Sequence, residues 1–166
     1  MSLADYSMQM SALSNLQKAQ RKIREITSWY GKMLKAAKDE LQQATRMKSS
    51  MRQQIQASVF AYTSKLQMGM NAALTSKNGE KDEHLYQSLF LQYNQAQERG
   101  KMYLASYDEQ VDETLRIKQE YISTLEANKQ SELASAQMDE NFYKQIHDTY
   151  KQKSAEGVQR DFSAKS

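Results

Sequence analysis

The absence of proline is the feature that most constrains how this chain can fold. Its 166 residues contain no proline and only five glycines, whereas proline makes up about 5% of average sequences. Both residues are poor helix formers and mark turns in other proteins. The chain is therefore predicted to be all-α, and its length is that expected of a single domain.

The polarity of the chain predicts a thin helical structure. Hydrophobic residues make up 39% of the sequence and the mean hydropathy is −0.86, which is too polar for a thick globular core. Intrinsic disorder is the competing interpretation of such polarity. The ten tyrosines, the ten methionines and the periodic spacing of the apolar residues argue against it.

Apolar residues recur with helical spacing along nearly the whole chain. From residue 51 they step by 4, 4 and 3, an eleven-residue repeat of about 3.67 residues per turn. The residues in this seam are Leu16, Ala19, Ile23, Ile26, Tyr30, Met33, Ala37, Leu41, Ala44, Met51, Ile55, Val59, Tyr62, Leu66, Met70 and Ala73. The same period returns at Leu85, Leu89, Tyr93, Ala96, Gly100, Leu104, Tyr107, Val111, Leu115, Lys118 and Ile122, and again at Phe142, Ile146 and Tyr150.

The stretch TSKNGEKDEH (75–84) is the only cluster of turn-forming residues, with Asn78-Gly79 at its centre. It predicts a long antiparallel two-helix hairpin, coiled-coil-like, as one domain over 1–154. Helix 1 is expected over about 3–75, a turn over 76–82, helix 2 over about 83–153 and a frayed tail over 155–166. The alternatives are a separate short N-terminal helix ending near Gly31, or a three- or four-helix bundle with breaks at Gly31 and Gly100.

Charge supports an antiparallel pairing in which paired residue numbers sum to about 159. Residues 18–52 hold ten Lys/Arg and three acids, a net charge of +7, and would lie opposite residues 107–141, which hold nine acids and three bases, a net charge of −6. Flanking charges of opposite sign select partner and orientation in coiled coils. The same pattern would also serve an intermolecular pairing.

No motif for catalysis or for cofactor or metal binding is found. The chain lacks cysteine, and neither His84 nor His147 follows an acid at Glu-x-x-His spacing. No glycine pattern matches a phosphate loop. We therefore expect neither an enzyme, nor a cofactor, nor a small-molecule substrate.

The basic segment suggests an alternative function. Nucleic acid or an anionic membrane surface could bind there, with aromatic side chains for stacking or for the membrane interface. The competing interpretation is a solvated face matched by the acidic second helix. The candidate contacts are Lys18, Arg21, Lys22, Arg24, Trp29 and Tyr30.

Trp29-x-Gly31 resembles the motif of the WXG family of small secreted helical hairpins. In that family the motif lies in the turn between the helices, whereas here it falls inside a continuing helical period. No Tyr-x-x-x-Asp/Glu signal is found near the C-terminus either. No residue role is carried over from the family.

An excess of apolar residues outside the seam flanks the turn. A two-helix hairpin buries one stripe per helix, so a second stripe predicts an interface with self or with a protein partner. The candidate residues are Ala57, Phe60, Ala61, Met68, Tyr86 and Phe90.

These features favour a non-enzymatic helical subunit that self-assembles or docks on partner helices in a larger assembly, such as a secretion apparatus, filament or virion. A chaperone-like adaptor for an exported helical protein is a further alternative. The N-terminus lacks the basic and apolar regions of a cleavable signal peptide. Synthesis in the cytoplasm is expected, followed by residence there, signal-less export or incorporation into a particle.

Overall fold

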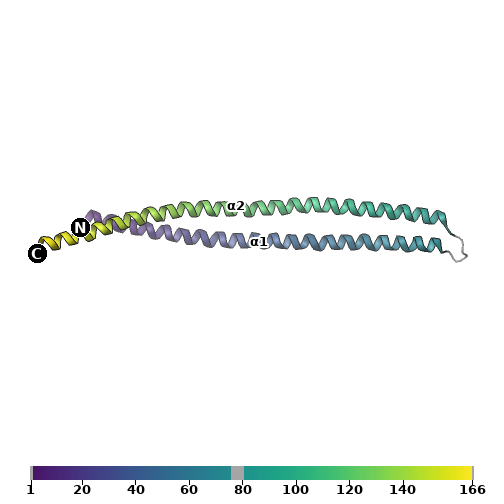
Figure 1. Cartoon of the computed structure of the whole chain (residues 1–166), viewed down its shortest axis with the longest axis horizontal. Coiled ribbons are helices and arrows are strands. Elements are labelled where there is room, and N and C mark those ends of the chain that lie inside the picture. The colour runs from purple at the N-terminus through teal and green to yellow at the C-terminus, as the bar shows by residue number, and fades with distance from the viewer. Residues whose placement is uncertain (1, 76–80, 166) are drawn as a thin grey trace. The chain divides into compact units, whose positions relative to one another are not determined.

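The structure, a computed structural model, describes residues 2–75 and 81–165, with side chains to residue 160. Two long helices, α1 (Leu3–Leu74) and α2 (Glu83–Lys165), pack against each other in antiparallel directions (Figure 1). The described residues contain no strand. The predicted all-α helical hairpin is thereby confirmed.

The helix bounds exclude the alternatives with extra breaks and differ from the main prediction at the end of α2. Helix α1 continues through Gly31, and α2 continues through Gly100, so neither glycine ends a helix and the bundle alternatives are wrong. Helix α2 also extends to Lys165, past the expected end at residue 153. Of the predicted turn over 76–82, residues 76–80 lie outside the described part of the chain.

The chain divides into two compact units, each made of one stretch of α1 and one of α2. The tip unit spans Lys38–Glu120 and includes the end of α1 and the start of α2. The terminal unit consists of Met1–Ala37 and Tyr121–Ser166. Each unit is described by itself below.

Both helices begin with a side-chain cap. The Ser2 hydroxyl accepts a hydrogen bond from the Asp5 amide (3.0 Å), and the Asp82 carboxylate accepts one from the Leu85 amide (3.1 Å). Such caps satisfy amides that lack a partner in the first helical turn. The Asp82 amide also donates to the Ala73 carbonyl (2.9 Å), which ties the start of α2 to the end of α1.

Two glycines let the helices of the tip unit approach closely. A Cβ atom at Gly100 would lie 2.9 Å from Val59 Cγ1, and one at Gly69 would lie 3.1 Å from Leu89 Cδ1. These facing residues have numbers close to the predicted sum of 159. The same register is set by three ion pairs between the helices, Lys48–Asp112, Arg52–Asp108 and Lys118–Glu40.

Large side chains do not fit where the helices are closest. Thr63 is buried in the seam, and its hydroxyl donates to the Val59 and Phe60 carbonyls of its own helix. Tyr62, which was predicted to lie in the seam, is exposed instead. The seam predictions for Met51 and Leu85 are likewise wrong, since both side chains are exposed.

The seam of the terminal unit is built mainly from alanine and leucine-sized side chains. The prediction for Phe142 is wrong, because it is exposed while its neighbour Tyr143 is partly covered. The buried residues of this unit are Ala12, Leu16, Ala19, Ile26, Tyr30, Leu34, Ala37, Ile122, Leu125 and Ala136.

Within the described residues, neither helix carries a stretch that is long and apolar enough to cross a membrane.

Candidate interaction surfaces

The first surface is an apolar stripe on the outer face of α1 in the tip unit, called here the outer stripe. It consists of Ala57, Phe60, Ala61 and Met68, whose i, i+3, i+4, i+11 spacing places them on one side of the helix. All four are exposed, and Phe60 and Met68 retain 73% and 71% of their accessible surface. Phe60, the largest side chain of the outer stripe, is therefore mostly exposed.

The two predicted interface residues of α2 differ in their exposure. Tyr86 and Phe90 stack on each other, with ring centroids 6.2 Å apart. Tyr86 is partly covered, so its predicted position outside the seam is wrong, whereas Phe90 is exposed. Because Leu89 faces Gly69, Phe90 lies level with Met68 of the outer stripe, about 12 Å along the helix axis from Phe60. Of the six predicted residues, all but Tyr86 are exposed.

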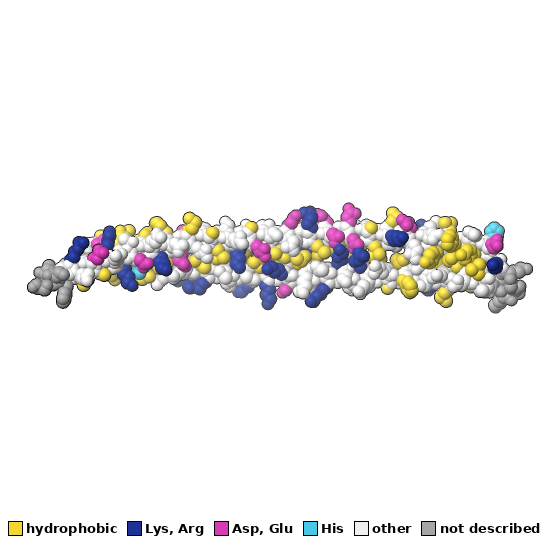
Figure 2. Space-filling model, in the orientation of Figure 1, with side chains coloured by type: hydrophobic (Ala, Val, Ile, Leu, Met, Phe, Trp, Pro, Cys, Tyr) yellow, Lys and Arg dark blue, Asp and Glu magenta, His cyan; other side chains and the backbone are white. Residues whose placement is uncertain are grey.

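Figure 2 shows hydrophobic side chains gathered on the tip unit near the end where α1 stops and α2 starts. Five further large side chains of α2 are exposed within this unit: Leu85, Leu91, Met102, Tyr103 and Ile117. Monomeric proteins rarely expose contiguous apolar patches of this kind without a partner.

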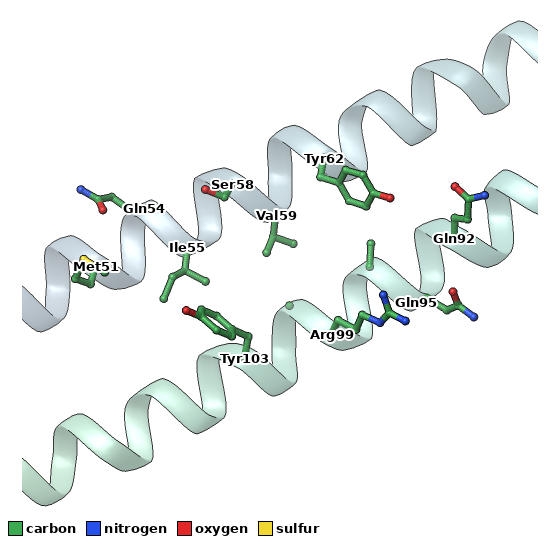
Figure 3. A pocket seen from close by; sticks show the side chains of 12 residues that line it. Met51, Gln54, Ile55, Ser58, Val59, Tyr62, Gln92, Gln95, Arg99 and Tyr103 are labelled. Atoms are coloured by element: carbon green, nitrogen blue, oxygen red, sulfur yellow. The ribbon is translucent and has the colours of Figure 1, made fainter.

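An open groove of about 700 Å³ lies beside the close contact of Val59 with Gly100 (Figure 3). Tyr62 points from α1 toward α2, and Tyr103 points from α2 toward α1, so the two rings border the groove. Its polar lining includes Arg99 and three glutamines, Gln54, Gln92 and Gln95. The sequence interpretation missed this groove, because it placed Tyr62 in the seam.

The terminal unit carries a second kind of surface, which we call the Trp29 cluster. Trp29 is 53% exposed and borders a shallow hollow of about 420 Å³ together with Arg21, Arg24 and Lys32. Glu25 and Ser28 complete the lining. Lys18 and Lys22, also predicted contacts, are exposed on the same helix.

Tyr30 is not part of this surface, and its predicted availability for stacking is wrong. It is only 5% exposed and meets Trp29 edge to face, at 4.7 Å between ring centroids. Burial, and then the nearby Glu132 carboxylate, raise the pKa of the Tyr30 phenol above its usual value. Tyr30 therefore acts as a neutral core residue of the terminal unit.

Basic side chains of the predicted basic segment form ion pairs with acids of α2 in the tip unit but, among the described residues, not around Trp29. In the tip unit, Lys48 and Arg52 pair with acids of α2, and the Arg52 guanidinium lowers the pKa of Asp108. In the part of the terminal unit that the structure describes, no acid pairs with the bases of the predicted contact set or with Lys32. The predicted pairing of the basic segment with acids of α2 thus holds for some of its members only.

The two histidines lie apart along α2. His84 is exposed near the helix start, and His147 Nδ1 lies 3.4 Å from the carboxylate of its neighbour Asp148. Across residues 2–75 and 81–165, no three His, Asp or Glu side chains gather as a metal site.

Comparison with protein families, with curated proteins and with solved structures finds no significant match to this chain.

Proposed function

We propose that the protein is a non-enzymatic helical subunit whose tip unit packs against helices of another chain, either a second copy or a partner protein, within a larger assembly. The observation that carries this proposal is the outer stripe, an exposed apolar face with helical spacing on the side of α1 that α2 does not cover. An amphipathic face of this kind is what helix-to-helix docking uses.

Two further features of the tip unit support the proposal. The groove beside Gly100 is lined by the aromatic rings of Tyr62 and Tyr103, by the aliphatic Ile55 and Val59, and by three glutamines, which suits a packed helix with a polar margin. Methionines at positions 47, 51, 68 and 102 are exposed, and flexible methionine side chains adapt to more than one partner shape. A chaperone-like adaptor would use the same surface, with one client protein as its partner.

The proposal is tested by sedimentation velocity of the purified chain and of a Phe60→Ser/Met68→Ser variant. Both side chains are exposed, so helicity measured by circular dichroism is expected to change little. The wild type is expected to sediment as an assembly, or with one stoichiometric partner, and the variant at the mass of a single chain. Loss of this apolar area should weaken association at least about tenfold.

The terminal unit supplies a matched control. Met138 and Phe142 are 72% and 57% exposed there, so Met138→Ser/Phe142→Ser removes the same two side-chain types from another place. This control is expected to sediment like the wild type. The proposal fails if wild type and both variants are single chains without a partner, or if the control dissociates as readily as the outer-stripe variant.

A further inference from the structure

Exposed basic side chains surround Trp29 in the terminal unit. Arg21, Arg24 and Lys32 border one hollow with the indole, and none of them forms an ion pair among the described residues. One acid, Glu25, lies in the hollow beside these three bases, and Glu132 lies beside Tyr30. The surface is therefore cationic with a flat aromatic ring at its centre.

An exposed tryptophan among cations has two common uses, at a membrane interface and on a single-stranded nucleic acid. A membrane-bound helix needs a wide apolar face. Between residues 11 and 37, Trp29 is the only exposed large hydrophobic side chain that the structure describes. The other large apolar side chains of this stretch are buried or partly buried. The apolar area for membrane binding is thus missing on this face.

We infer that the Trp29 cluster binds single-stranded nucleic acid, with a base stacked on the Trp29 indole and phosphates held by Arg21, Arg24 and Lys32. Lys22 lies seven residues before Trp29, two turns along the same side of α1. It extends the cationic track along which a strand would run. This binding is separate from the proposed assembly function, since it uses the other unit of the chain.

The chain contains a built-in probe, because Trp29 is its only tryptophan. A thymidine oligomer of about 20 nucleotides is expected to quench Trp29 fluorescence at about 20 mM salt. Binding should weaken steeply as salt rises. The full-length protein is used throughout, with anisotropy of a labelled oligomer as the second measurement.

The central variant is Arg21→Ala/Arg24→Ala/Lys32→Ala, in which exposed bases are replaced by the best helix former. It is expected to weaken oligomer binding at least about tenfold and to reduce the slope of log K against log salt by about 2. Trp29→Ala is expected to cost about tenfold through lost stacking. The matched control Arg46→Ala/Lys65→Ala/Lys101→Ala removes three positive charges from the tip unit and should change binding less than about twofold.

Two comparison probes decide between ligand classes. Vesicles of phosphatidylglycerol should not shift the Trp29 emission to the blue, and polyglutamate should bind more weakly than the thymidine oligomer. The inference is overturned by vesicle binding without oligomer binding, or by equal affinity for polyglutamate. It is equally overturned if the oligomer does not bind at low salt, or if the tip-unit control weakens binding as much as the central variant.

Discussion

At the scale of single residues, replacing Gly100 and replacing Gly31 with alanine should change stability in opposite directions. A Cβ at Gly100 would meet both methyl groups of Val59 at 2.9 and 3.0 Å, whereas nothing lies within 4 Å of a Cβ at Gly31. Gly31→Ala is expected to stabilise the protein by about 1 kcal/mol, because alanine is the better helix former. Gly100→Ala gains the same propensity but overpacks the contact, at a cost of about 1–3 kcal/mol. Thermal and urea unfolding measure both changes.

A double variant separates packing from propensity at this contact. Val59→Ala removes the two methyl groups, so Gly100→Ala should cease to be destabilising in that background and approach the effect of Gly31→Ala. An equal loss of stability from Gly100→Ala with and without Val59 would contradict the close-contact explanation.

The close contact also explains which residues the sequence placed wrongly. Steps of four and three leave two neighbouring positions near the edge of the seam, here Tyr62 and Thr63, and the spacing predicts Tyr62 as the seam residue. Between Val59 and Gly100 the helices leave little space, so the small Thr63 is buried and Tyr62 lies at the edge of the groove, half exposed. Apolar spacing alone contains no information about the distance between the helices.

At the scale of the helices, the antiparallel register rests on pairs that respond to pH. The Arg52 guanidinium lowers the pKa of Asp108 below its ordinary value of 3.8, although partial burial opposes the shift. One Asp108 carboxylate oxygen is buried without a partner among the described residues. A carboxylate with a lowered pKa stabilises the folded state above its ordinary pKa, and this contribution is lost as pH falls through the lowered value.

Asp108→Asn is therefore expected to lower the Tm most near neutral pH. The difference in Tm from the wild type should shrink as the pH falls below about 4 and through the lowered pKa of Asp108, because the protonated carboxyl group is then uncharged, like the asparagine amide. Asp139→Asn, which changes an acid that forms no ion pair among the described residues, serves as the control and should show a much smaller effect. A constant difference across this pH range would argue against the Arg52–Asp108 pair.

Sequence spacing and charge predicted the two helices, their antiparallel order and their register, because these follow from repeated features spread over many residues. Which bases of the basic segment form ion pairs and which do not could not be predicted in this way. Lys48 and Arg52 reach acids of α2, whereas Arg21 and Arg24 do not, and net charge per window cannot separate the two groups. That difference depends on where each side chain points around its helix.

At the scale of the whole molecule, each unit offers a different kind of surface. The tip unit exposes apolar side chains on the outer stripe, and the terminal unit exposes the cationic Trp29 cluster. The chain has no cysteine. The reactivity of a single introduced thiol can therefore show whether another chain covers the surface around it on either unit. Met68 and Met138 are suitable positions because they are almost equally exposed, at 71% and 72%.

The most direct measurement is the rate of maleimide labelling of Met68→Cys and Met138→Cys in lysate of the cells that make the protein, compared with the isolated chain at high dilution. Both thiols should react at similar rates in the dilute chain. In the lysate, the thiol at position 68 is expected to react at least about tenfold more slowly, because another copy or a partner helix covers the outer stripe. Equal labelling rates at the two positions in the lysate would contradict the account.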